Sequence, residues 1–505
     1  MGIGWDITRG LLGASRAAGT TLGNAAQQNA AIRQAARGSR AVRRGVVGPW
    51  DEIPTDANDF LDYRGVARPE DLRVAPWSFP LGRYVLPHSS RRQTEWVGEH
   101  EFGLTSETAN KHSVVYAPTQ FGKTTSVIAP WIYSALRQGY LVVALDLKGN
   151  GDLLSKVESY EATQEPLLDL AITNLDYTHP GQSEHWNWIA DLVDDSAIDA
   201  AATALVGKDR DNDPNREFRL RDLKWMRGLL EFVHDSGKPW TIETILRLLD
   251  DHERFVRLIS NTAPPRAQSR LSDLVYLPAE EYYTKVQFVT TFLEVLNTPG
   301  WNFVTSRRGL AIEALVDEPG LVVVSAPLAD GKLSEAVSSL FLSQFLNVQA
   351  RRFNTASRPV LLVLDEAPRL QERLDLPRLM STTASSGMSV LLALQEVTDL
   401  NEDGRKTILA NCATHILMGG AGPDTTGYFA DRLGKRIVSN KTHSTTYTAQ
   451  AGRSFQVGVQ SSEVDVLGRN ELVAAPGGPF SAVVHSYDLS RKPILVDFTR
   501  RDLLP

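Results

Sequence analysis

The chain has 505 residues, of which 42% are hydrophobic and 22% charged, and its formal net charge is −7. This length allows two or three domains with a large core, and the composition is that of an ordinary globular protein. The net charge excludes a polycation that binds nucleic acid over its whole surface. The single cysteine, Cys412, excludes a disulfide framework, and no apolar run reaches the roughly 20 residues that span a bilayer.

The first 50 residues predict a basic arm. Its only acid is Asp6, and Ile3, Ile7 and Leu11 recur at helical spacing. Four interpretations stay open: a membrane-surface anchor, an arm on a phosphate backbone, a docking helix for a partner, or a solvated terminus. We expect a cytoplasmic protein, with peripheral contact to the inner face of the cell membrane as one option. The arginines of the arm are Arg9, Arg16, Arg33, Arg37, Arg40, Arg43 and Arg44.

A phosphate-binding loop is predicted at residues 117–125, whose sequence is Ala-Pro-Thr-Gln-Phe-Gly-Lys-Thr-Thr. The loop follows an apolar strand-like run at 113–116 and opens a helix-like segment at 124–136. Backbone N–H groups at the start of a helix, together with the helix dipole, attract phosphate groups. This order of strand, Gly-Lys-Thr loop and helix therefore predicts a nucleoside triphosphate site.

Individual residues of the loop have predicted roles. Lys123 would reach the β- and γ-phosphates of ATP, and the Thr124 hydroxyl would bind Mg²⁺. Ala117 stands where the usual pattern has glycine, so its φ angle must stay negative. The residues expected to contact ATP are Thr119, Gln120, Phe121, Gly122, Lys123, Thr124 and Thr125.

Residues 139–146 predict the next buried strand, which runs into the sequence Asp146-Leu-Lys-Gly. A strand, a helix and a second strand at this spacing form a βαβ unit and hence a parallel sheet. Short strands between 49 and 112 are expected to pack against the first core strand. We assign residues 51–184 to these N-terminal strands and the first part of the core.

Residues 185–300 have a different pattern, in which apolar and aromatic residues recur at helical spacing. Thr241 is a candidate N-cap, with Thr244 three residues later. We find no β-type run in this stretch, so it predicts an all-α domain inserted into the α/β sheet. Residues 301–505 then form the second part of the core.

A second chemical motif lies at residues 359–366, an apolar run of strand length that ends in Asp365 and Glu366. Acidic residues at the carboxyl end of a buried parallel strand lie where open α/β sheets bind ligands. Asp365 is expected to hold Mg²⁺ through water, and Glu366 to polarise the attacking water. Gln395 ends the following strand, where its amide can contact the water and the γ-phosphate.

Phosphoryl transfer also requires further positive charge near the transferred group, which ring ATPases usually take from an arginine of a neighbouring subunit. The sequence offers several candidates and favours none: Arg369, Arg373, Arg378 and Arg405. The other elements expected in this part are strands at 320–327, 389–395 and 414–418, helices at 333–353, 375–386 and 428–433, and an exposed hairpin or loop at 439–462.

The ordered set of motifs resembles the TraG/TraD-type coupling ATPases of conjugation and type IV secretion. The resemblance rests on the loop 117–124, the strand ending at Asp146-Leu-Lys-Gly, and the segment Leu364-Asp-Glu-Ala-Pro-Arg-Leu. Gln395 and a downstream block also match, the latter made of Asn411-Cys-Ala-Thr, Pro423-Asp-Thr-Thr and Leu433-Gly. The resemblance covers roughly residues 111–500 by pattern.

This resemblance implies a RecA-like P-loop NTPase core with a predominantly parallel sheet and an inserted all-α domain. It implies a homo-hexameric ring that uses ATP and Mg²⁺ to move DNA towards a secretion channel. The DNA is expected to be single-stranded, with or without a bound relaxase, and the channel proteins are expected partners. Family members commonly carry N-terminal transmembrane helices, which this sequence lacks.

Other functions remain compatible with the sequence. One is a soluble FtsK/HerA-like DNA translocase that is not linked to secretion. Another is a protein-substrate receptor in which the all-α domain binds the substrate and the nucleotide only switches the conformation. A third is a nucleotide-binding scaffold without turnover, against which the carboxylate of Glu366 argues.

Overall fold

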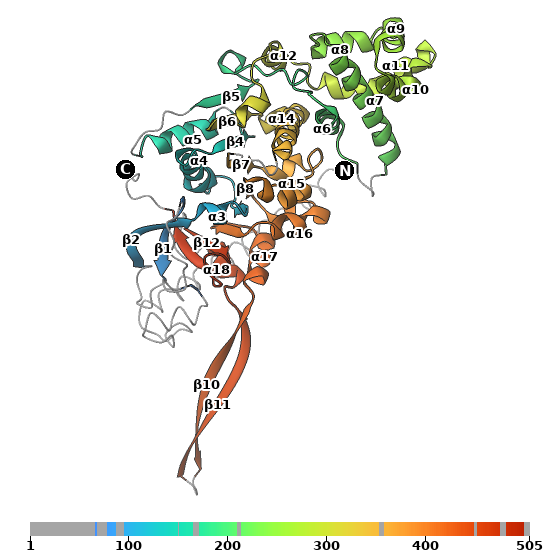
Figure 1. Ribbon diagram of the computed structural model, residues 1–505. Helices are drawn as coiled ribbons and strands as arrows, with labels where there is room; N and C mark the ends of the chain where they lie inside the picture. The colour runs from blue at the N-terminus through green and yellow to red at the C-terminus, as the bar shows by residue number, and fades with distance from the viewer. Residues whose placement is uncertain are drawn as a thin grey trace, which may run out of the picture. The chain divides into compact units, whose positions relative to one another are not determined.

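The computed structural model describes residues 66–67, 78–86, 95–149, 151–164, 171–209, 214–352, 358–448, 452–474 and 481–498. The predicted basic arm lies outside these residues. The central feature is an eleven-stranded sheet with the order β2-β1-β13-β12-β9-β3-β8-β7-β4-β6-β5 (Figure 1). Its strands are β1 (Phe79–Leu86), β2 (Glu95–Leu104), β3 (Ser113–Tyr116), β4 (Leu141–Asp146), β5 (Ile172–Asp176), β6 (Gly320–Ser325), β7 (Val360–Asp365), β8 (Met388–Leu394), β9 (Thr414–Met418), β12 (Ser481–Ser486) and β13 (Ile494–Asp497).

The seven strands from β9 to β5 are parallel. Every residue of β3, β4, β7 and β8 is buried. Strands that are covered on both faces need apolar side chains at successive positions, which is why these segments are continuous apolar runs in the sequence. The predicted parallel core is therefore confirmed, and its strands all end at the same edge of the sheet.

The other end of the sheet is antiparallel and differs from our expectation. β1 pairs with β13, β13 with β12, and β12 with β9. The prediction that the N-terminal strands pack against the first core strand is thus wrong. Three strands, β13, β12 and β9, separate β1 from β3, and two of them come from the last part of the chain. Short strands carry no local signal of such a distant partner.

Helices cover the sheet and connect its parallel strands. After β3, a π-turn at Thr124–Ile128 leads into α4, whose Trp131 packs against Phe79 of β1 with ring centroids 5.4 Å apart. The single cysteine, Cys412, is buried just before β9. The helices of the core are α3 (Ser106–Ala109), α4 (Ala129–Arg137), α5 (Asp152–Glu161), α14 (Lys332–Arg351), α15 (Leu376–Thr382), α16 (Glu402–Ala410), α17 (Pro423–Leu433) and α18 (Arg469–Ala474).

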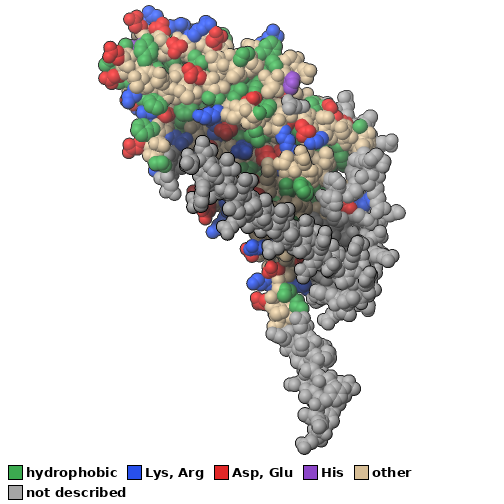
Figure 2. Space-filling view, turned by 180° about the vertical axis from the view of Figure 1, so that it is seen from behind, with side chains coloured by type: hydrophobic (Ala, Val, Ile, Leu, Met, Phe, Trp, Pro, Cys, Tyr) green, Lys and Arg blue, Asp and Glu red, His purple; other side chains and the backbone are tan. Residues whose placement is uncertain are grey.

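The chain between β5 and β6 forms a helical insert, and the structure describes no strand there (Figure 1). Thr241 caps α8: the Thr244 amide donates to its hydroxyl at 3.3 Å, and the Thr241 amide donates to the Thr244 hydroxyl at 2.8 Å. The helices are α6 (Asp195–Val206), α7 (Arg216–Asp235), α8 (Ile242–Leu249), α9 (His252–Thr262), α10 (Pro265–Val275), α11 (Ala279–Glu294), α12 (Pro299–Thr305) and α13 (Ile312–Leu315). Acidic and basic side chains are interspersed on the face of the insert seen in Figure 2.

Aromatic packing joins the insert to the core. The Trp186 ring lies between Trp301 and Phe341, at centroid distances of 5.9 and 5.3 Å. Phe341 belongs to α14, which packs along α6, and Gln344 of the same helix donates to the Trp188 carbonyl at 3.0 Å. These contacts connect the start of the insert to a helix that leads into β7 and its acidic end.

The segment after α17 forms the predicted hairpin, with β10 (Lys435–Thr448) paired in register with β11 (Gly452–Asp465). These two strands make a sheet of their own, separate from the eleven-stranded one. Within the part of the chain that the structure describes, no helix combines the length and the apolar character needed to cross a bilayer.

Candidate nucleotide-binding site

The loop 117–123 leaves β3 next to the end of β8. The Ala117 amide donates to the Leu394 carbonyl at 3.1 Å, which fixes the start of the loop beside the strand that carries Gln395. Ala117 does not have a positive φ angle, so its methyl group fits where the usual pattern has glycine. The loop instead turns at Gln120 and Gly122, whose φ angles are 68° and 81°. A left-handed angle is unusual for glutamine and indicates a tightly constrained turn.

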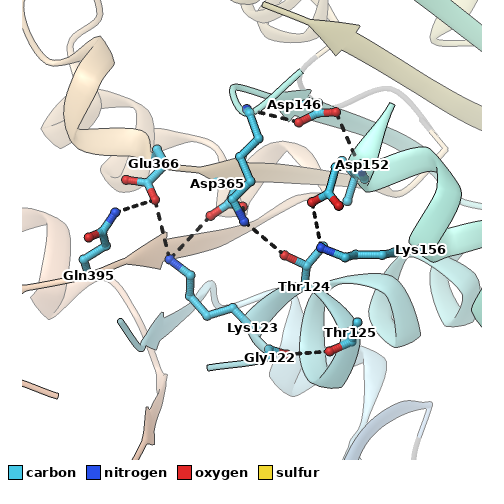
Figure 3. Close-up of polar contacts among 12 residues, drawn as sticks. Gly122, Lys123, Thr124, Thr125, Asp146, Asp152, Lys156, Asp365, Glu366 and Gln395 are labelled. Carbon is cyan, nitrogen blue, oxygen red and sulfur yellow. Dashed lines mark hydrogen bonds and ion pairs between the residues drawn. The ribbon is translucent and has the colours of Figure 1, made fainter. Parts of the chain in front are cut away.

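Lys123 extends from this loop towards the two acids at the end of β7 (Figure 3). Its Nζ lies 3.7 Å from Asp365 Oδ1 and 3.7 Å from Glu366 Oε1. The lysine side chain is only 4% exposed, yet neither its Nζ nor Asp365 Oδ1 has a hydrogen-bond partner among the described residues. Buried charged groups are usually hydrogen-bonded, so this ammonium and this carboxylate oxygen can still bind a polar ligand.

Glu366 is held in a defined orientation. Its φ angle is 62°, in the left-handed region, and Gln395 Nε2 donates to its Oε1 at 2.8 Å (Figure 3). β8 lies between β3 and β7 in the sheet, so Gln395 comes between the lysine loop and the acidic strand. Glu366 and Gln395, which were each expected to act on the attacking water, are therefore in direct contact.

Thr124 and Asp365, the residues expected to bind Mg²⁺, lie on either side of the Lys148 ammonium. Lys148 Nζ lies 3.5 Å from Thr124 Oγ1 and 3.4 Å from Asp365 Oδ2. A hydroxyl and a carboxylate are ligands that Mg²⁺ accepts, usually with water molecules completing the coordination. A positive charge lies between them in this structure, so the two side chains fit a metal cation.

The loop that carries Lys148 is fixed by Asp146. The carboxylate accepts hydrogen bonds from the amides of Lys148 at 3.2 Å and Gly149 at 3.0 Å. Burial raises the pKa of Asp146, and these amide bonds oppose that effect. Gly149 has a φ angle of 73°, and a β-carbon there would meet Pro327 at 2.3 Å, so the turn requires glycine.

The remaining residues of the predicted loop are arranged around this site. Thr119, Gln120, Phe121 and Thr125 are exposed. The Phe121 ring packs against Gly420 after β9, where an added β-carbon would lie 2.5 Å from the ring. Gly420 was not singled out in the sequence, because only the fold reveals that it contacts the phosphate-binding loop.

The four arginine candidates differ in their surroundings. Arg373 donates to the carbonyls of Ala204 and Leu205 in α6, at 2.8 and 2.5 Å. Arg405 donates to the Leu400 carbonyl at 2.8 Å. Both guanidinium groups are thus engaged within the chain, whereas Arg369 and Arg378 are exposed.

Sequence comparison links the acidic half of this site to a known family. No curated protein matches the chain. Residues 359–476 match the family model described as the TraM recognition site of TraD and TraG, and this segment includes Asp365, Glu366 and Gln395. The predicted resemblance to the TraG/TraD coupling proteins is confirmed.

Solved structures of conjugative coupling proteins share the fold of this chain. The bacterial conjugative coupling protein TrwBdeltaN70 in an unbound form is 15% identical, covers 85% of this chain and 96% of its own, and has a TM-score of 0.58. Plasmid coupling protein TrwB with the ATP analogue ADPNP is 15% identical, with coverages of 86% and 98% and a TM-score of 0.59. TrwB with ADP and Mg²⁺ is 16% identical, with coverages of 85% and 96% and a TM-score of 0.55. The predicted fold class, a RecA-like α/β core with a helical insert, is confirmed.

Proposed function

We propose that this chain is an ATP-hydrolysing motor of the TraG/TraD coupling type. One observation carries the proposal: a buried lysine ammonium at the end of a phosphate-binding loop lies 3.7 Å from each of two carboxylates and lacks a hydrogen-bond partner among the described residues. A triphosphate and its metal would supply the missing partners. That TrwB is recorded with ADPNP, and with ADP and Mg²⁺, supports the same ligands here.

In this proposal each residue has a defined task. Lys123 and the backbone of 119–125 hold the phosphates, while Thr124 and Asp365 hold Mg²⁺, which would supply charge neutralisation at the phosphates. Glu366 orients the attacking water and accepts its proton. Gln395 keeps the Glu366 carboxylate in position through its 2.8 Å hydrogen bond.

We further propose that the work of the motor is the movement of DNA towards a secretion channel. Residues 359–476 match a family model described as the TraM recognition site of TraD and TraG, and this match supports a protein partner in a conjugation system. Residues 185–300 would act as the substrate-recruiting domain, and a hexameric ring would enclose the strand. Arg369 or Arg378 would then be available to reach a neighbouring subunit, because both are exposed.

The test is hydrolysis by the purified full chain with and without single- and double-stranded DNA. We expect DNA to stimulate ATPase activity, and Lys123→Ala to abolish both nucleotide binding and hydrolysis. Lys156→Ala is the matched control, because Lys156 pairs with Asp152 at 2.7 Å in the neighbouring helix α5. Unchanged activity at all DNA lengths would contradict the DNA motor, and nucleotide binding by Lys123→Ala would contradict the site.

A channel-independent translocase of the FtsK/HerA kind would also show DNA stimulation. The coupling function and the channel-independent function are distinguished by affinity purification of the chain from a cell that expresses the secretion genes. Co-purification of channel proteins supports the coupling function. Recovery of the chain from such cells without any channel protein contradicts the coupling function and favours the channel-independent translocase.

A further inference from the structure

Lys148 is a charged residue of the site to which the proposed function gives no task. It follows β4, and the side chain is 35% exposed. Its ammonium lies between the Thr124 hydroxyl and the Asp365 carboxylate, at 3.5 and 3.4 Å. β4 and β7 are neighbours in the sheet, so the loop after β4 and the acid at the end of β7 meet at one edge.

An ammonium and Mg²⁺ cannot occupy this position together. Mg²⁺ binds oxygen ligands at about 2.0–2.1 Å, and a second positive charge within a few ångströms would repel it. The distances from Lys148 Nζ are longer than a good hydrogen bond, so the contact is largely electrostatic. The lysine therefore neutralises Asp365 without a strong bond that would hold it there.

The backbone of Lys148 is fixed, which leaves its side chain as the part that moves. The Lys148 and Gly149 amides donate to Asp146 Oδ1, and the Leu328 amide donates to the Leu147 carbonyl at 2.8 Å. The side chain has open surface to move into, because it is about one-third exposed. Lys123, by contrast, is buried, so only one of the two lysines beside Asp365 can leave at low cost.

We propose that Lys148 is a placeholder cation, which occupies the Mg²⁺ position before nucleotide binds and leaves it when Mg²⁺ arrives with the nucleotide. This inference rests on the proposed function, since it requires a metal–nucleotide complex at Thr124 and Asp365. It makes Lys148 a positioning residue: its ammonium pairs with the Asp365 carboxylate at 3.4 Å before nucleotide binds, and it competes with Mg²⁺.

The test measures binding and not turnover. Fluorescent mant-ADP is titrated into the full chain in EDTA and over a range of Mg²⁺ concentrations. The midpoint is the Mg²⁺ concentration at which half of the change in mant-ADP affinity has occurred. In Lys148→Met, which keeps the length but not the charge, we expect this midpoint to fall roughly fivefold, the size of one partly exposed ion pair. The affinity of Lys148→Met for mant-ADP in EDTA should equal that of the original chain, because Lys148 does not contribute to phosphate binding in this proposal.

Two control variants test whether the effect depends on the positive charge at position 148. Lys148→Arg retains the cation and should keep the midpoint within about twofold of the original. Lys156→Met removes a lysine of similar exposure that pairs with Asp152 instead, and it should leave the midpoint unchanged.

An unchanged midpoint in Lys148→Met overturns the inference. So does weaker binding in EDTA, which would make Lys148 a phosphate ligand. Binding of mant-ADP by the original chain, with loss in Lys123→Met, keeps the proposed function intact in either case. If the original chain binds no mant-ADP under any condition, the proposed function fails, and the placeholder role fails with it.

Discussion

The candidate nucleotide site and the helical insert differ in where their charged side chains lie and how closely these are paired. At the edge of the parallel strands, Lys123 and Asp365 are buried and 3.7 Å apart, and neither Lys123 Nζ nor Asp365 Oδ1 has a hydrogen-bond partner among the described residues. On the insert, charged residues form close pairs at the surface, such as Lys224 with Asp273 at 2.6 Å. The buried Glu231 has the Arg270 guanidinium 2.9 Å from its Oε1, while its Oε2 has no hydrogen-bond partner among the described residues. Surface pairs contribute little to stability, whereas buried ion pairs are costly unless further hydrogen bonds satisfy their remaining polar atoms.

This difference predicts that substitutions in the two regions change different properties of the protein. Substitutions at the sheet edge are expected to alter nucleotide chemistry while the fold persists. Substitutions in the insert are expected to alter its stability while nucleotide binding persists. The following experiments test this division, beginning with the largest expected effect.

The largest effect is expected for Glu366→Gln. The amide keeps the size of the side chain and can still accept from Gln395, but it cannot take a proton from water. Hydrolysis should fall by about 10²–10⁴-fold, the usual contribution of a general base, while nucleotide affinity is retained. The measurement is single-turnover hydrolysis alongside mant-ADP binding. Glu402→Gln, at the exposed start of α16, is the control; normal turnover by Glu366→Gln would remove Glu366 from the mechanism.

In the insert, Phe255→Ala should produce the largest loss of stability. Phe255 is fully buried and packs against Tyr282 with ring centroids 5.4 Å apart. Removing a buried aromatic ring costs about 3–5 kcal/mol of unfolding free energy. Urea unfolding followed by circular dichroism gives the cost, and mant-ADP affinity should not change. Tyr276→Ala, at a position that is 86% exposed, should shift stability by less than about 0.5 kcal/mol.

A smaller change in the free energy of unfolding is expected when the pH is lowered, and it should come from a histidine in the core. His112 is buried, with its Nδ1 accepting from the Val390 amide and its Nε2 donating to the Met380 carbonyl, both at 3.1 Å. Burial lowers the pKa of His112 from 6.5 to about 4. Between these values the unfolded chain binds more protons, so the free energy of unfolding should rise with pH from 4 to 6.5, and this contribution is lost as the pH falls.

The slope for one histidine is about 1.4 kcal/mol per pH unit within this window. Urea unfolding at pH 5 and pH 6.5 measures it, and His112→Gln should flatten it, because the variant has no group that titrates there. Burial also lowers the pKa of His485 to about 4, so part of the slope should remain. An identical slope in the variant would show that His112 is not held neutral by the fold.

The smallest effect concerns the start of α8. Thr241→Ala removes the hydroxyl that accepts from the Thr244 amide, and losses at such caps are about 1 kcal/mol. The midpoint of urea unfolding should fall, with hydrolysis unaffected. Thr284→Ala, an exposed position inside α11, should cause no comparable loss. If the two variants behave alike, the cap does not stabilise the insert.

Much of the site was predictable because its parts are encoded locally. The buried strands β4, β7 and β8 are nearly continuous apolar runs, and Asp365, Glu366 and Gln395 stand at or just after the ends of two of them. Parallel strands bring these ends to one edge, so the order of motifs was sufficient to predict their meeting. The Thr241 cap was likewise visible from its spacing to Thr244.

The parts that escaped prediction depend on pairing between distant segments. The antiparallel strands β12 and β13 join β1 to β9 across most of the chain, and no local pattern specifies that register. The position of Lys148 follows from the pairing of β4 with β7 and from the turn that Asp146 fixes. The sequence placed the segment Asp146-Leu-Lys-Gly at the end of a buried strand and within the family resemblance, but it assigned Lys148 no role.

The burial of Cys412 has a practical consequence. It is the only cysteine of the chain, and burial raises the pKa of its thiol to about 12. The thiolate is the form that adds to a maleimide, so the native sulfur should remain inert in the folded protein at neutral pH. A cysteine introduced at a chosen surface position can therefore carry a dye or spin label alone, without first constructing a cysteine-free background.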